Sequence, residues 1–158
     1  MKFTKGYWMN LPGVTNTDAV QVREVKVEND RVYLYTVPYH ADMRAMGGPL
    51  LEMYISSPQP DIIRTEAYHF MGSNQKMPAF ELNDAHCALE VENTETTVTI
   101  KSGNTKLVIG KNPCSFDYYY KDKKLTSIGN RFGNAMISTI STPDGNYMRA
   151  QMNLDIGQ

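Results

Sequence analysis

The sequence predicts an all-β protein, an antiparallel β-sandwich with little or no helix. Nearly every readable segment alternates apolar and polar residues with a period of two, which is typical of strands that bury one face. Short clusters of turn-forming residues separate these segments at regular intervals. No stretch of three helical turns can be placed. Strands of this kind, joined by tight turns, pack as two facing sheets.

The first clear strand contains a change of phase. The valines at 20 and 22 are followed by valines at 25 and 27, so the alternation slips by one residue at Arg23-Glu24. A β-bulge there restores the register, because it adds one residue to one strand only. A turn at 28–30 then leads into a stretch at 31–39 that is rich in Val, Tyr and Thr. The pair predicts a hairpin, and Pro38 is expected to end its second strand.

Eight further segments have the composition and alternation of strands. They are 51–55, 62–70, 87–91, 96–101, 105–109, 116–120, 125–128 and 135–141. Between them lie residues that tolerate positive φ or preset a tight reversal, at 57–61, 102–104, 121–124 and 142–145. Two segments without clean alternation, 40–49 and 71–84, are expected to cross the sandwich as loops, where binding residues commonly lie.

The last segment, 148–156, alternates most regularly. We expect its apolar set to face the core and the residues between them to face water. That set is Met148, Ala150, Met152, Leu154 and Ile156.

Length and charge limit the classes of function. A chain of 158 residues most simply makes one domain, spanning 1–158, and is large enough to bury a core without a metal or a disulfide. Its formal net charge of -1 argues against a nucleic-acid partner, which selects for a basic surface. The N-terminus lacks the apolar run of a signal peptide, and no segment is apolar enough to span a membrane. We therefore expect a cytoplasmic protein in which Cys87 and Cys114 are free, buried thiols.

No residue pattern predicts a catalytic or metal site. His40, His69 and His86 are far apart, and a histidine such as His69 in a strand is more often half-buried with one hydrogen bond than a ligand. Neither cysteine lies at a helix start or in a Gly-rich turn that would activate it, and there is no Gly-x-Ser-x-Gly motif. The glutamates mostly fall on the polar side of strands, so we expect them at the solvated surface.

The aromatic residues leave two interpretations open. Ten tyrosines, five phenylalanines and Trp8 provide surfaces on which sugar rings could stack, but most are expected to pack in the core. In the FDYYY segment, alternation directs Phe116, Tyr118 and Tyr120 inward and Tyr119 outward.

Several short stretches along nearly the whole chain carry a family resemblance. They are GYWMNLPG at 6–13, AVQVREV at 19–25, SSP at 56–58, IIRTEAYHF at 62–70, KSGN at 101–104, NYM at 146–148 and LDIG at 154–157. No single stretch is as specific as a set of metal ligands, so the likeness depends on their order and spacing. On these residues the chain resembles the N-terminal domain of glycoside hydrolase family 31 enzymes, especially the bacterial α-xylosidase branch.

The resemblance implies a β-sandwich of the galactose-mutarotase-like type, followed in the full-length enzyme by a (β/α)8 barrel with two catalytic aspartates. The chain is expected to be an N-terminal fragment that stops before this barrel, and to be inactive alone. The parent is implied to be a retaining α-glycosidase, of α-xylosidase or α-glucosidase type, that needs no metal or organic cofactor. Its barrel and its oligosaccharide substrate are then the partners of this domain.

The family resemblance also implies that this domain sends a loop toward the sugar pocket of the barrel. The matching segment runs from about 129 to 147, and loops on a rigid scaffold often determine specificity. Structural roles stay open for this segment, since an aromatic residue can pack beneath the loop and 143–145 can simply turn a hairpin. The candidate substrate residues are Arg131, Phe132, Asn134, Asp144 and Asn146.

Two other classes of function stay open. A stand-alone carbohydrate-binding module would also use a β-sandwich and aromatic side chains. A structural or assembly role would follow if aromatic and Met-rich surfaces drive self-association into a homo-oligomer.

Overall fold

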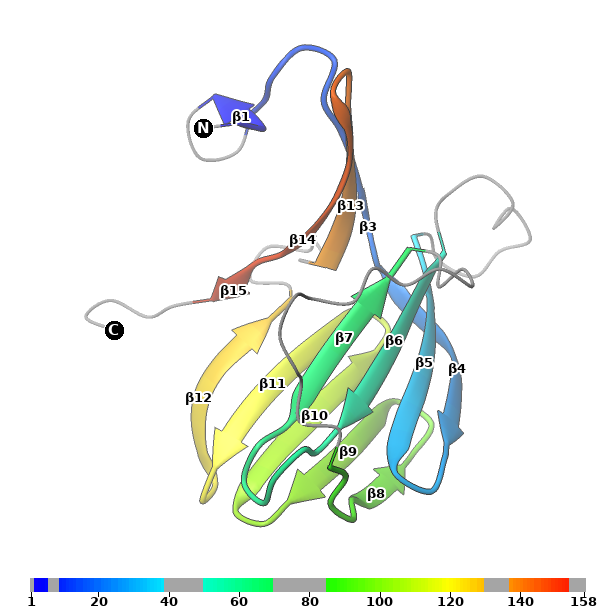
Figure 1. Ribbon diagram of the computed structural model, residues 1–158, viewed down its shortest axis with the longest axis vertical. Helices are drawn as coiled ribbons and strands as arrows, with labels where there is room; N and C mark the ends of the chain where they lie inside the picture. The colour runs from blue at the N-terminus through cyan, green and yellow to red at the C-terminus, as the bar shows by residue number, and fades with distance from the viewer. Residues whose placement is uncertain (1, 6–8, 39–49, 70–84, 130–136, 154–158) are drawn as a thin grey trace.

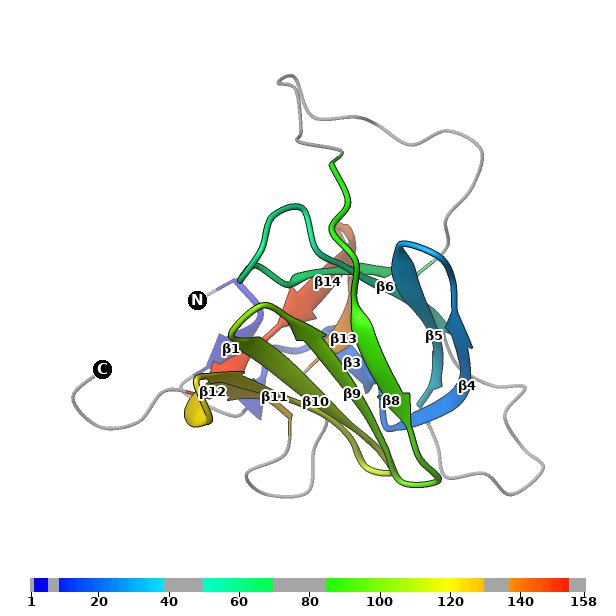
Figure 2. The same ribbon diagram turned by 90° about the horizontal axis from the view of Figure 1, so that it is seen from below.

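The computed structural model describes residues 2–5, 9–38, 50–69, 85–129 and 137–153. Within these ranges the regular structure consists of strands, with no helix, and the strands form four antiparallel sheets. Two of these sheets lie face to face as a β-sandwich (Figure 1; Figure 2). The predicted all-β, antiparallel architecture is therefore confirmed. The expected loops at 40–49 and 71–84 lie outside the described residues.

The larger sheet has six strands in the order β15-β12-β11-β10-β9-β8, and every neighbouring pair is antiparallel. Its strands are β8 (Glu90–Asn93), β9 (Thr97–Ser102), β10 (Thr105–Lys111), β11 (Cys114–Tyr120), β12 (Lys123–Ile128) and β15 (Met152–Asn153). The predicted turns at 102–104 and 121–124 are present, with Gly103, Lys121 and Asp122 at positive φ. The segment predicted at 87–91 becomes a strand only from Glu90 onward.

The second sheet has four strands in the order β4-β5-β6-β7, again antiparallel. They are β4 (Gln21–Val27), β5 (Arg31–Val37), β6 (Leu51–Ser56) and β7 (Arg64–Tyr68). The pairing of β4 with β5 shifts by one residue between Val22 and Glu24, so Arg23 is the extra residue of a bulge. The bulge predicted from the valine alternation is confirmed. β5 ends directly before Pro38, also as predicted.

The core lies between these two sheets. Alternation along β5, β6, β9 and β10 turns every second side chain inward. The four-stranded sheet contributes Val22, Val32, Leu34, Leu51, Met53 and Ile55, and the six-stranded sheet contributes Val98, Ile100, Leu107, Ile109, Cys114, Phe116 and Ile128. All of these side chains are buried. Their removal from water is the main favourable term that holds the sheets together.

Hydrogen bonds tie the sheets together at two opposite ends of the four-stranded sheet. Ahead of β4, the Val20 N–H donates to the Val37 carbonyl at 2.9 Å, and the Val20 carbonyl accepts from the Cys114 N–H at 2.6 Å. After β6, the buried hydroxyls of Ser57 and Ser102 share a hydrogen bond of 2.6 Å. Since β4 and β6 run in the same direction, the two contacts fix the sandwich at both ends.

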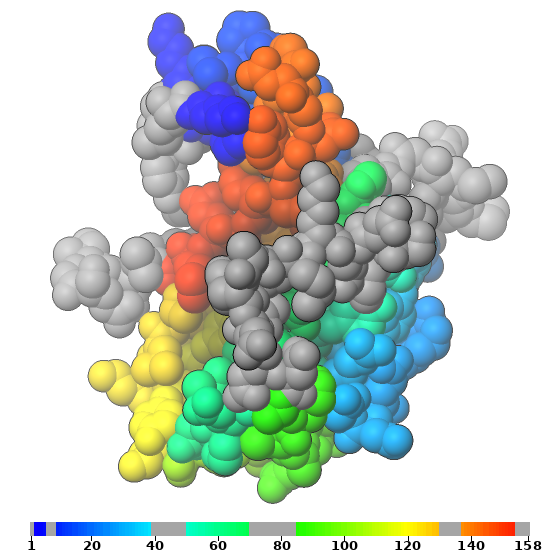
Figure 3. Space-filling view, viewed as in Figure 1, coloured from blue at the N-terminus to red at the C-terminus, as the bar shows by residue number. Residues whose placement is uncertain are grey.

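A three-stranded sheet, called the small sheet below, projects beyond the sandwich (Figure 1; Figure 3). It has the order β14-β13-β3, with β3 (Thr15–Asp18), β13 (Ile137–Thr142) and β14 (Gly145–Ala150). A hairpin of β1 (Thr4–Lys5) and β2 (Met9–Asn10) lies beside it, and the rings of Phe3 and Tyr147 are 5.2 Å apart. The chain runs from β3 into β4 and from β14 into β15, so the small sheet is continuous with both sheets of the sandwich.

The prediction for the last segment is wrong. The sequence predicts one strand at 148–156 with its apolar face in the core, but β14 ends at Ala150 and β15 covers only Met152–Asn153. Met148 is 41% exposed and Met152 is 51% exposed. The reason is that β14 pairs within the small sheet, which does not lie between the two sheets of the sandwich. Leu154 and Ile156 lie outside the described residues.

Other expectations need smaller corrections. Phe116 is buried and Tyr118 packs against the core as expected, but Tyr120 is 38% exposed because it ends β11 at the edge of the hairpin. Cys114 is buried as expected, whereas Cys87 is only half-buried, and both are free. The strand β3 has no counterpart among the predictions, since its sequence Thr-Asn-Thr-Asp contains no apolar residue.

Leu107→Ala should lower the free energy of unfolding by about 2–5 kcal/mol, because it removes a fully buried side chain and leaves a cavity between the sheets. Urea unfolding followed by circular dichroism measures the change. Leu125→Ala is the matched control: the same truncation at a residue that is 46% exposed should cost about 0.5 kcal/mol or less. Equal losses in the two variants would contradict this assignment of the core.

Candidate functional site

Alternation along the small sheet places four hydroxyl side chains on one face. They are Thr15 and Thr17 of β3 and Thr139 and Ser141 of β13, whereas Ser138 and Thr142 of β13 alternate to the other face. β-branched threonine suits a pleated strand. Antiparallel pairing then aligns these residues across the sheet, and β14 extends both rows. The register forms the rows Thr15–Ser141–Asn146 and Thr17–Thr139–Met148.

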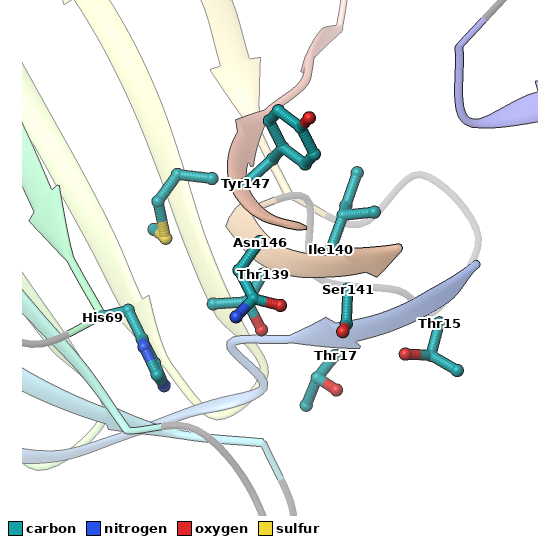
Figure 4. A pocket seen from close by; sticks show the side chains of 9 residues that line it. Thr15, Thr17, His69, Thr139, Ile140, Ser141, Asn146 and Tyr147 are labelled. Atoms are coloured by element: carbon teal, nitrogen blue, oxygen red, sulfur yellow. The ribbon is translucent and has the colours of Figure 1, made fainter. Parts of the chain in front are cut away.

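These two rows form one wall of a pocket of about 380 Å³ (Figure 4). His69, which directly follows β7, lines the pocket from the opposite side. Ile140 and Tyr147 also line it, but their side chains point to the other face of the small sheet. The volume falls within the range of roughly 300–1,000 Å³ that is typical of small-molecule sites. The pocket is therefore the candidate functional site.

The described part of the pocket lining is rich in uncharged polar groups. Among the described residues that line it, none is an aspartate, glutamate, lysine or arginine. Its hydrogen-bonding side chains are those of Thr15, Thr17, Thr139, Ser141, Asn146 and His69. Within the described part of the chain, none of these six side chains hydrogen-bonds another protein group. The pocket thus offers uncharged donors and acceptors that the fold itself does not use.

The opposite face of the small sheet has several of its polar groups paired with one another, although Ser138 Oγ and Arg149 Nε are buried without a hydrogen-bond partner. Asn16 Nδ2 donates to the Asp18 carboxylate at 2.6 Å, and Arg149 Nη2 donates to Asn16 Oδ1 at 3.5 Å. Burial raises the pKa of the Asp18 carboxyl, although the Asn16 hydrogen bond and the positive charge of Arg149 oppose the rise. Further along this face, Lys2 Nζ donates to Tyr147 Oη at 2.6 Å. This face therefore contributes to the fold rather than to an open site.

The structure describes two of the five candidate substrate residues. Asn146 lines the pocket from β14. Asp144 lies at the exposed tip of the β13–β14 hairpin, where its N–H donates to Thr142 Oγ1 at 3.2 Å, and it does not line the pocket. Arg131, Phe132 and Asn134 lie outside the described residues. The role of all five in contacting a sugar stays a prediction.

Sequence reasoning missed most of the pocket. It suggests a half-buried His69 with one hydrogen bond, but His69 is exposed at the pocket because β7 ends one residue before it. The threonines of β3 are not among the candidate substrate residues, and neither are Thr139 and Ser141, although these two lie within the predicted segment 129–147. For β3, the signal that could have found them is a period of two in hydroxyl residues, visible at Thr15 and Thr17. The sequence of β13 shows no such period, because Ser138 and Thr142 also carry hydroxyls.

Other reactive groups lie apart from this pocket. Cys114 is buried, and desolvation raises the pKa of its thiol to about 12, which keeps it protonated. His86 Nε2 lies 3.7 Å from the Asp30 carboxylate. Among the described residues, no three histidine, cysteine or acidic side chains gather as metal ligands. The same ranges contain no helix that could cross a bilayer.

The described residues define a class: an antiparallel β-sandwich with an added small sheet and an uncharged pocket. No protein-family model matches the chain. The α-xylosidase XylQ of Lactiplantibacillus pentosus is 23% identical over 165 aligned residues, which cover 100% of this chain and 21% of XylQ. The chain therefore spans about a fifth of the length of this curated relative. The predicted resemblance to the α-xylosidases of glycoside hydrolase family 31 is confirmed by this similarity.

Solved structures confirm the fold. The cycloalternan-forming enzyme of Listeria monocytogenes, solved with a pentasaccharide substrate, matches with a TM-score of 0.60 and 18% identity. That match covers 84% of this chain and 11% of the enzyme. The protein lmo2446 of Listeria monocytogenes EGD-e, solved with glucose, magnesium and calcium, matches with a TM-score of 0.61 and 16% identity. That match covers 87% of this chain and 12% of lmo2446.

The half-buried carboxyl of Asp18 should leave a signature in the pH dependence of stability. Its pKa is raised in the folded protein, so the folded state binds this proton more tightly than the unfolded state, where the ordinary value is 3.8. The stabilisation from the protonated form is full below the unfolded pKa and is lost as pH rises through the folded pKa. The free energy of unfolding of the wild type, relative to Asp18→Asn, should therefore fall as the pH rises above the unfolded value of 3.8.

Denaturant unfolding of both proteins at each pH measures this difference. Asp144→Asn, at the exposed tip of the hairpin, is the matched control and should differ little from the wild type in its free energy of unfolding at each pH. A difference between wild type and Asp18→Asn that stays constant or grows with pH would show that burial does not dominate at Asp18.

Proposed function

We propose that the chain is the non-catalytic N-terminal β-sandwich domain of a retaining α-glycosidase of glycoside hydrolase family 31, of α-xylosidase or α-glucosidase type. The observation that carries this proposal is the alignment of 100% of the chain with 21% of the α-xylosidase XylQ. This chain covers a similarly small share of the matched solved structures, 11% and 12% of their lengths. If the chain is one domain of a larger carbohydrate-active enzyme, nearly all of it should match a small part of each relative, as it does.

The chemistry of the described residues supports a non-catalytic role. Retaining hydrolysis uses two carboxyl groups about 5–5.5 Å apart, on either side of the bond that is cleaved. The described residues that line the pocket include no carboxyl group. Two glutamates of the four-stranded sheet are paired with cations instead, Glu24 at 3.0 Å from Lys26 and Glu66 at 3.4 Å from Arg64. In this proposal both catalytic aspartates belong to a (β/α)8 barrel in the remainder of the enzyme.

In the parent enzyme the domain supports the barrel and contributes to the substrate pocket. The exposed Met148 and Met152 lie on the strand segments that link the small sheet to the six-stranded sheet, and apolar surface of this kind suits burial against another domain. The substrate loop is the segment that holds Arg131, Phe132, Asn134, Asp144 and Asn146. We further propose that the enzyme uses no metal or organic cofactor, because the two-carboxylate route needs neither. We also propose that it is cytoplasmic.

A stand-alone carbohydrate-binding module is the second candidate function. The uncharged pocket of the described residues favours it, since a binding module requires a site but no catalytic carboxyl pair. The two candidates differ in whether the chain acts alone or as part of a longer polypeptide.

The chain alone should not hydrolyse aryl α-xylosides or aryl α-glucosides, because the catalytic pair lies outside it in this proposal. Release of p-nitrophenol measures turnover, with XylQ as the positive control under the same conditions. Activity that stays with the chain through successive purification steps would contradict the non-catalytic assignment.

A further inference from the structure

We infer that the pocket between the small sheet and His69 binds one uncharged sugar ring. Its binding groups are the side chains named above, in the rows Thr15–Ser141–Asn146 and Thr17–Thr139–Met148, with His69 as the facing wall. The choice of a sugar rests on the proposed function. The location of the site and the requirement for an uncharged ligand rest on the geometry of the pocket.

The described part of the lining favours an uncharged ligand on energetic grounds. An anion is best bound by arginine, lysine or a set of free backbone N–H groups, and a cation by carboxylates or an aromatic cage. The described residues that line the pocket include no aspartate, glutamate, lysine or arginine. Bringing an ionised group into contact with hydroxyls and methyl groups removes water from the charge without an opposite charge to compensate. An uncharged molecule loses much less when it is desolvated in this pocket.

The arrangement of the groups favours a ring that carries several hydroxyls. Neighbouring strands are about 4.7–4.9 Å apart, and residues two positions apart on one strand are separated by about 6.8 Å. The small sheet therefore presents a grid of uncharged donors and acceptors rather than a single polar group. A polyhydroxylated ring can meet members of both rows at once. The Met148 side chain and the threonine methyl groups provide apolar contacts for the C–H groups of the ring.

The difference in hydrogen bonding between the two faces of the small sheet supports a binding role for the pocket face. On the opposite face, Asn16 bonds both Asp18 and Arg149, and Ser138 Oγ and Arg149 Nε are buried without a partner. On the pocket face, the six polar side chains have no hydrogen-bond partner within the described residues. Groups that are only hydrated can exchange water for ligand hydroxyls and keep their hydrogen bonds, so ligand binding costs them little.

The tyrosines on the outer face of the four-stranded sheet are the strongest competing site, and they are already engaged. Tyr33 and Tyr68 donate to glutamate carboxylates at 3.2 Å and 3.0 Å. The Arg31 guanidinium lies over the Tyr54 ring, 4.6 Å from its centroid. Neighbouring rings are inclined by 54° and 68°, so they form no common plane for a sugar to stack on. The pocket is therefore the better site for a sugar ring.

Titration of the isotope-labelled chain, followed by ¹H–¹⁵N correlation spectra, tests the inference. The probes are methyl α-xyloside and methyl α-glucoside, with glucuronate and glucosamine as charged analogues of similar size. We expect saturable shifts confined to β3, β13, β14 and His69, with a Kd of about 1–20 mM for the neutral sugars. The two charged analogues should bind at least about tenfold more weakly.

Two variants assign the binding to the pocket. Asn146→Ala and Thr139→Val each remove one hydrogen-bonding group from the lining, and each should raise the Kd about fivefold to tenfold. Asn29→Ala is the matched control, because Asn29 is exposed in the turn between β4 and β5, away from the small sheet, and the Kd should not change. Unchanged spectra outside the small sheet verify that each variant is folded.

The outcomes separate this inference from the proposed function. Absence of saturable shifts, or shifts centred on Tyr33 and Tyr54, overturns the assignment of the pocket and leaves the glycosidase-domain proposal standing. Equal affinity for glucuronate overturns the requirement for an uncharged ligand. A Kd far below 1 mM supports the pocket but favours a stand-alone binding module over a domain that needs its barrel. Turnover of aryl glycosides contradicts the proposed function alone.

Discussion

The rest of the structure depends on one constraint. The four-stranded and six-stranded sheets must bury their facing apolar side chains against each other. Each sheet has one apolar face, and the two faces cover each other completely at residues such as Leu34 and Leu107. Both ends of this layer are fixed, by the Val20 backbone at one end and the Ser57–Ser102 hydrogen bond at the other. The small sheet lies outside this layer, so its composition is free to be polar.

Features that depend on neighbouring residues could be predicted from the sequence. The bulge at Arg23 follows from a one-residue slip in valine alternation, and the end of β5 follows from the ring of Pro38. The reversal at Gly103 follows from turn chemistry, since Gly103 adopts a positive φ. In each case the physical cause lies within a few residues of its effect, and no tertiary contact is needed to infer it.

The pocket could not be predicted in the same way, because it depends on which strands pair. The alternation of Met148 and Met152 is the same whether that face meets a core, solvent or another domain, and only the pairing of β14 with β13 decides. The two threonines of β3 come from a segment with no apolar residue, and they join the site only through their register with β13. His69 meets them across a gap from a different sheet. Of the described pocket residues, only Asn146 is among the candidate substrate residues of the sequence analysis, and that prediction rests on the family resemblance.

The pocket and the exposed methionine surface of β14 and β15 adjoin each other at Met148. This side chain belongs to the pocket lining, and it is also the first of the exposed methionines on β14 and β15. Period-two alternation directs Asn146, Met148 and Ala150 to the same face of β14. A barrel that packs on the methionines, as proposed for the parent enzyme, therefore also borders the pocket. Docking would then deepen a pocket that is open in this chain, which is the physical reason to expect only weak affinity for a sugar when the barrel is absent.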